Sequence, residues 1–170
     1  MLRIQNLTKK YGDKVAVENL NLEVEAGNIT AFIGHNGAGK TTTLKCVSGV
    51  LDFEEGEIEV DGISIKQRPL EAKARLAYIP DNPDLYDFLS GIKYLEFIAD
   101  VFGIDGDLRK ERIERYAEMF GLKGDLANKI GTYSHGMKQK LAVISALLHE
   151  PRLMMLDEPF VGLDPVATHQ

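Results

Sequence analysis

The sequence predicts an α/β fold with an antiparallel β region near the N-terminus and a helical block inserted between two strands of the core. Three observations predict it. Residues 2–7 and 15–24 alternate apolar and polar side chains, as half-buried antiparallel strands do. Beyond about residue 90 the apolar residues recur at helical spacing. A four-residue apolar run at 153–156, enclosed by prolines, then predicts a buried strand.

Short elements separated by turns fill the first eighty residues. The β-rich run 29–33 predicts a strand, and a glycine-rich turn after it leads into a predicted helix over 40–48. Residues 56–65 predict a hairpin around an Asp-Gly pair, and residues 75–79 predict another strand.

Three helices are predicted in the block 81–150, which should interrupt a core made of 1–80 and 151–170. The apolar positions that mark them are Ile92, Leu95, Ile98 and Phe102 in the first, Ile113, Tyr116, Ala117 and Phe120 in the second, and Met137, Leu141, Ile144 and Leu148 in the third.

Composition narrows the function classes. The net charge of −6 argues against nucleic acid as the main partner, because phosphate backbones attract clustered Lys and Arg. Cys46 is the one cysteine, so no internal disulfide is expected. The chain has no apolar run of membrane-spanning length and no signal peptide at its start. We therefore expect a cytoplasmic protein whose membrane role, if it has one, comes through a partner.

A phosphate loop is predicted between the strand 29–33 and the helix after it, because the pattern G-x-x-x-x-G-K-[ST] occurs there. Glycines let successive backbone N–H groups face phosphate oxygens, Lys40 adds a positive charge, and the Thr41 hydroxyl can ligate Mg²⁺. The alternative is a glycine turn beside a surface lysine, which the strand–loop–helix context disfavours. The candidate nucleotide-binding residues here are Gly34, His35, Asn36, Gly37, Ala38, Gly39, Lys40, Thr41 and Thr42.

Two acidic residues follow the predicted strand 153–156. Ligands of open α/β sheets bind beyond the carboxyl ends of the strands. Asp157 is therefore a candidate for holding Mg²⁺, and Glu158 for polarising the attacking water as general base. Two solvated acids in a turn are the alternative, and the phosphate loop elsewhere in the chain disfavours it.

With these motifs in this order, the whole chain resembles the ATP-binding domain of ABC transporters. Residues 132–140 stand where the family carries its signature, 155–159 form its acidic strand motif, and 161–165 resemble its D-loop. Tyr11 stands where the family stacks an aromatic ring on adenine, although a tyrosine packed at a strand end explains that position nearly as well.

The resemblance implies that two such domains pair head to tail and bind ATP with Mg²⁺ between the phosphate loop of one and the signature of the other. It also implies an integral membrane permease as partner and a place at the inner face of the membrane. Ser134 can cap the helix that follows, and Gly136 leaves its N–H groups approachable, so this helix end suits a γ-phosphate. Spacing alone favours a plain helix cap, and the order of the motifs reverses that preference.

The sequence departs from the family pattern in places. Asp81 replaces the usual glutamine and remains a candidate ligand of Mg²⁺ or water, while His135 and Met137 replace the usual glycine and glutamine of the signature. This variant resembles a subgroup associated with efflux. The family also has a histidine some tens of residues after the acidic pair, whereas this chain ends at Gln170. We therefore expect a C-terminally truncated domain that binds ATP but hydrolyses it weakly.

Three other readings remain. A GTPase should carry Asn/Thr-Lys-x-Asp, and residues 128–131 lack the final Asp. An ABC ATPase of translation or DNA repair stays open, since the short insert disfavours only the chromosome-structure type. A regulatory module without turnover is disfavoured by the presence of Lys40, Asp157 and Glu158.

Overall fold

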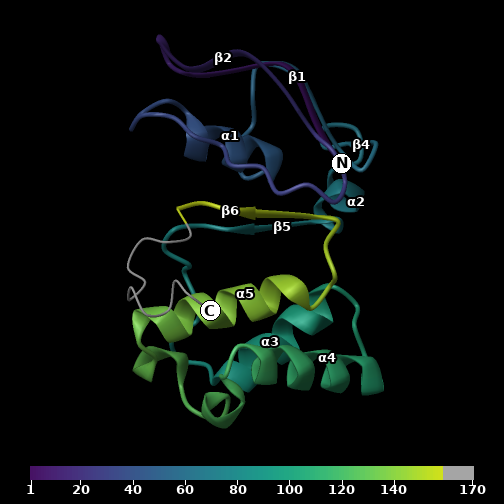
Figure 1. Ribbon diagram of the computed structural model, residues 1–170, viewed down its shortest axis with the longest axis vertical. Coiled ribbons are helices and arrows are strands. Elements are labelled where there is room, and N and C mark those ends of the chain that lie inside the picture. The colour runs from purple at the N-terminus through teal and green to yellow at the C-terminus, as the bar shows by residue number, and fades with distance from the viewer. Residues whose placement is uncertain (159–170) are drawn as a thin grey trace. The chain divides into compact units, whose positions relative to one another are not determined.

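The computed structural model describes residues 1–158, which fall into two compact units (Figure 1). Among the described residues, the first comprises Met1–Tyr78 and Pro151–Met155, and the second comprises Ile79–Glu150 and residues 156–158. The domain boundaries expected at 80 and 150 stay a prediction. The predicted D-loop at 161–165 lies outside the described residues.

An antiparallel sheet dominates the first unit, with strand order β2-β1-β3-β4. Its strands are β1 (Leu2–Tyr11), β2 (Lys14–Val24), β3 (Glu55–Val60) and β4 (Ile63–Ser64). The central strand β1 pairs with both neighbours, so that Leu2 lies opposite Val24 on one side and Val60 on the other. The predicted hairpin over 56–65 is confirmed, since β3 and β4 pair around Asp61 and Gly62.

Helix α1 (Lys40–Val47) covers the apolar residues of this sheet, as its burial shows. Its Cys46 and Val47 are fully buried in one cluster with Ile4, Leu7 and Ile58 from the strands. Burial raises the pKa of the Cys46 thiol to about 11, which makes it a packing residue rather than a nucleophile. A five-residue helix, α2 (Pro69–Lys73), was not predicted.

The strand predicted at 29–33 is wrong for the chain as described. These residues have no regular structure, and Ile29 and Ile33 are almost fully exposed. A β-rich run becomes a strand only where a neighbouring strand receives its hydrogen bonds. Among residues 1–158, no strand pairs with this run.

Two short strands, β5 (Leu76–Ile79) and β6 (Leu153–Leu156), pair with each other and confirm both sequence predictions. Leu153 N donates to Arg75 O at 3.1 Å, and Asp157 N donates to Ile79 O at 2.9 Å. Because both partners advance together along the chain, the strands run parallel. Their carboxyl ends therefore lie side by side.

The second unit is helical. It contains α3 (Gly91–Val101), α4 (Gly106–Met119) and α5 (His135–Leu147), with the 3₁₀ turns η1 (Lys123–Asp125) and η2 (Ile130–Thr132). The three predicted helices are thus confirmed, and their marker residues Leu95, Ile113 and Leu141 are buried. Within residues 1–158, no helix has both the length and the apolar character needed to cross a membrane.

Candidate functional site

The glycine-rich loop ends at Gly39, which is the N-cap of α1 and carries no side chain to cap it. Its φ of 85° lies in the left-handed region, where L side chains are strained. A Cβ on Gly39 would also lie 2.5 Å from the carbonyl oxygen of Ala16 in β2. The fold therefore requires glycine here, and glycine leaves the first-turn N–H groups of α1 open to an anion.

Lys40 bends back over the loop that precedes it. Its Nζ donates to the carbonyl oxygens of Gly34 at 2.7 Å and His35 at 3.2 Å. The ammonium group thus contacts the carbonyl oxygens of the loop, and Lys40 is itself the first residue of α1. A phosphate group bound there would meet both the lysine charge and the positive end of the helix dipole.

The acidic residues follow the carboxyl end of β6. Asp157 is buried and Glu158 is exposed, so the two side chains occupy different environments. Glu158 has a φ of 47°, a left-handed conformation that is uncommon for glutamate. Such local strain often occurs at functional positions. Asp81 follows the adjacent strand β5, so the structure brings Asp81 and Asp157 to the same end of the strand pair.

Helix α5 carries the predicted signature at its N-terminus. Ser134 is the N-cap, and its Oγ accepts a hydrogen bond from Met137 N at 3.3 Å, which confirms the predicted cap. A Cβ built on Gly136 meets no atom within 4 Å, so this side of the first turn is open. His135 is exposed beside it. The helix end therefore presents accessible backbone, as an anion site requires.

Tyr11 ends β1 with its side chain 49% exposed. The ammonium group of Lys9 lies 5.4 Å from the centre of the ring. About half of Tyr11 is thus open to solvent, and its stacking on adenine stays a prediction.

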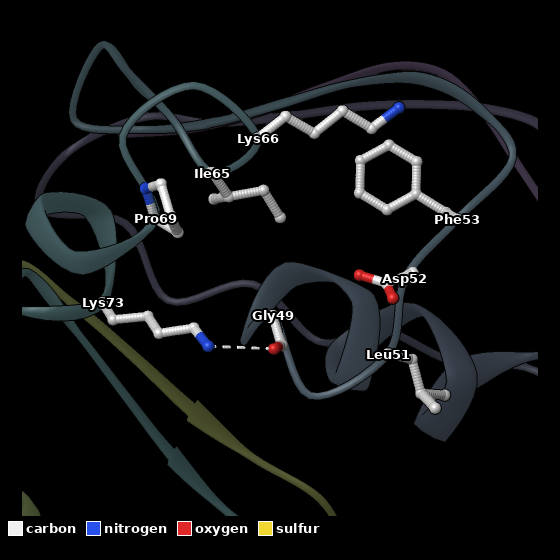
Figure 2. A pocket seen from close by; sticks show the side chains of 8 residues that line it. All are labelled: Gly49, Leu51, Asp52, Phe53, Ile65, Lys66, Pro69 and Lys73. Atoms are coloured by element: carbon white, nitrogen blue, oxygen red, sulfur yellow. Dashed lines mark hydrogen bonds between the residues drawn. The ribbon is translucent and has the colours of Figure 1, made fainter.

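The first unit contains a cavity of about 290 Å³, and none of the predicted site residues lines it. Figure 2 shows the side chains around it. Lys73 Nζ donates to the carbonyl oxygen of Gly49 at 3.0 Å, and Lys66 Nζ lies 4.0 Å from the ring centre of Phe53. These contacts connect α2 to the turn after α1, and the segment after β4 to the segment before β3, so both lysines have structural partners. The residues around the cavity are Gly49, Leu51, Asp52, Phe53, Ile65, Lys66, Pro69 and Lys73.

The residues present fit ATP and Mg²⁺. The uncapped first turn of α1 suits phosphate oxygens, and the hydroxyl of Thr41 and the carboxylate of Asp157 are hard oxygen ligands. Among residues 1–158, no group of three or more His, Cys, Asp or Glu could hold a metal by itself. Mg²⁺ does not need such a cage, because it keeps several waters and takes ligands from the substrate's phosphates.

A glycine loop that opens a helix, a strand that ends in acidic residues, an antiparallel sheet in one unit and a helical second unit are typical of a phosphate-loop nucleotide-binding fold. Residues 17–161 match the family model for the ABC transporter. The chain belongs to this family.

Known proteins resemble the chain over nearly its whole length. It is 36% identical to an uncharacterised ABC transporter ATP-binding protein, YhcH, of Bacillus subtilis (100% of this chain, 55% of the relative). It is also 36% identical to the Nod factor export ATP-binding protein I of Cupriavidus metallidurans (99% and 56%). A solved ATP-binding subunit of an ABC transporter superposes with a TM-score of 0.91 at 34% identity (99% and 70%). Both relatives are named as ATP-binding proteins of transport systems.

Proposed function

We propose that the chain is the ATP-binding and ATP-hydrolysing part of an ABC exporter, which powers translocation through a separate membrane permease. The observation that carries the proposal is the uncapped start of α1, where Gly39 leaves backbone N–H groups open beside the Lys40 ammonium group. The family match supports the reaction class. The chain spans about half the length of these two relatives, so the activity of the whole protein is a proposal.

Within this proposal, residues 34–42 bind the phosphates and Tyr11 stacks on the adenine. Thr41, Asp157 and Asp81 are the ligands proposed for Mg²⁺, directly or through water, and the bound ion would neutralise phosphate charge. Glu158 holds the attacking water and takes up its proton. Its exposure supports this role, because a general base must be reachable by water.

Ser134 and Gly136 complete the site in a second copy. Two copies paired head to tail would place the open first turn of α5 over the γ-phosphate held by the other copy's phosphate loop. The Ser134 cap and the open face at Gly136 support this arrangement. The partner at the inner membrane face is proposed to be an integral permease, and the export direction draws on the Nod factor export relative.

Mg-ATP hydrolysis tests the proposal. We expect residues 1–170 alone to bind ATP and hydrolyse it slowly, because the resemblance implies a transition-state donor further along the chain. A version continued to the length of the relatives should be faster by roughly 10²–10³-fold, the usual effect of one preorganised donor. Steady-state phosphate release at equal ATP occupancy compares the two. Equal rates would contradict the incomplete site, and no hydrolysis by either version would contradict the ATPase itself.

Asp81→Asn tests whether this residue connects the site to the membrane partner. The substitution keeps the side-chain shape but removes the charge that a metal or its water would use. We expect ATPase stimulation by the permease to fall several-fold, in the range of about 5–150-fold typical of coupled sites. The measurement compares basal with permease-stimulated ATPase in both proteins. Full stimulation in the variant would remove Asp81 from the coupling.

A further inference from the structure

Two side chains of helix α5 contact the segment 81–87, which leaves the end of β5. Gln139 Nε2 donates to the backbone carbonyl oxygen of Asp81 at 3.0 Å, although the two residues are 58 positions apart. One residue earlier, Lys138 Nζ lies 2.7 Å from Asp87 Oδ1. All four residues belong to the second unit.

The two ends of this segment are held differently. At its far end, Asp87 O accepts from Gly131 N at 3.0 Å, and Leu89 O accepts from Ile130 N at 2.9 Å, so the backbone is bonded to η2. At the near end, the Asp81 carboxylate accepts a local hydrogen bond from Asn82 N at 2.8 Å. The hydrogen bond from the Gln139 amide therefore ties Asp81 to a residue far away in the sequence.

Gln139 also faces the first turn of its own helix. Its Nε2 lies 3.3 Å from His135 Nε2, the ring nitrogen of the first residue of α5. Gln139 is half-buried, while the side chains of Lys138 and Asp87 are 27% and 59% exposed, so these contacts lie at the surface of the second unit. One amide thus connects the Asp81 backbone with the turn that Ser134 caps.

We propose that Gln139 is a positioning residue, which together with Lys138 fastens the segment 81–87 to the first turns of α5. We name the pair Lys138 and Gln139 the α5 latch. With the latch closed, Asp81 and the helix end at Ser134 and Gly136 move together. A displacement at Asp81 then changes the presentation of the helix end to the nucleotide. This effect on the nucleotide rests on the function proposed above.

Amide hydrogen exchange on the 170-residue chain tests the latch without any activity. Gln139→Met keeps the side-chain length but removes the donor, and Lys138→Ala removes the ion pair. Each should speed exchange of the amides within 81–87 by about two- to tenfold. Lys140→Ala is the matched control, because Lys140 is an exposed lysine on the same helix with no ion pair among the described residues. Unchanged exchange in both latch variants would overturn the proposal.

Two further comparisons show whether an effect is specific. The amides of Leu141–Leu147 report whether α5 itself has loosened, and they should exchange as in the unmodified chain. If exchange of these amides also becomes faster, the charge-swapped double variant Lys138→Asp with Asp87→Lys tests whether the ion pair itself is responsible. Restoration of slow exchange in 81–87 supports the latch, and failure to restore it overturns the ion-pair part.

Hydrolysis then separates the latch from the proposed function. In the version continued to the length of its relatives, Gln139→Met should lower kcat by roughly two- to thirtyfold and leave KM near its original value. An unchanged kcat in the variant overturns the positioning role and leaves the ATPase standing. If the unmodified protein does not hydrolyse Mg-ATP, the proposed function fails, and the exchange result still decides whether the latch exists.

Discussion

Glu158→Gln is expected to lower Mg-ATP hydrolysis by about 10²–10⁴-fold while leaving ATP affinity near its original value. The amide has the shape of the carboxylate but cannot take up a proton from water. Glu158 is exposed and follows directly after the buried Asp157, so its carboxylate is reachable by water. Its left-handed backbone (φ 47°) is compatible with either side chain, so the fold should be unaffected.

The measurement is kcat and ATP affinity of the version continued to the length of the relatives, with and without the substitution. Glu150→Gln is a matched control. Glu150 also has a left-handed backbone, with a φ of 51°, but its carboxylate is paired with Arg112 at 2.7 Å in the helical unit. The control should keep its rate. A Glu158→Gln protein with the original kcat would show that another group is the base.

Lys40→Ala is expected to weaken Mg-ATP binding by roughly 10–10²-fold, the usual worth of a hydrogen bond to a charged group. In the structure the Lys40 ammonium group already lies over the loop, 2.7 Å from Gly34 O. Its loss removes that positive charge from the phosphate loop and leaves the backbone N–H groups and the bound Mg²⁺ to hold the phosphates. Alanine is a good helix former, so α1 should keep its first turn.

Titration of Mg-ATP against both proteins measures this effect. Lys45→Ala is the control, because Lys45 lies in the last turn of the same helix and its removal changes the net charge equally. Weaker binding in both variants would mean that overall charge, not the phosphate loop, attracts ATP. Original affinity in Lys40→Ala would place the nucleotide elsewhere.

The predictions that the structure confirms concern short segments whose conformation depends mainly on their own residues. Ser134 caps α5 as predicted because its hydroxyl needs only a backbone N–H three residues away. The strand 153–156 and the helix at 40–48 follow from apolar pattern and glycine placement. The fold class and the order of the motifs could therefore be predicted.

The errors concern features that depend on distant neighbours. The strand predicted at 29–33 failed because β propensity does not supply a pairing partner. Helix α2 was missed because five residues carry too little periodicity, although Pro69 at its first position was a usable signal. The contact of Gln139 with Asp81 joins residues 58 positions apart, and no local pattern shows it.

Complementation between two inactive variants tests most directly whether ATP is hydrolysed between two copies. Lys40→Ala damages the phosphate loop. Gly136→Asp damages the signature, since its side chain fits the open face of α5 but places a negative charge where a γ-phosphate would lie.

Each variant alone, in the version continued to the length of the relatives, should have little activity. In a head-to-tail dimer, a mixed pair contains one site with an intact loop and an intact signature. Equal mixing should therefore restore about a quarter of the original rate, since about half the pairs are mixed and one of their two sites is intact. A mixture as inactive as either variant alone would contradict a site shared between two copies.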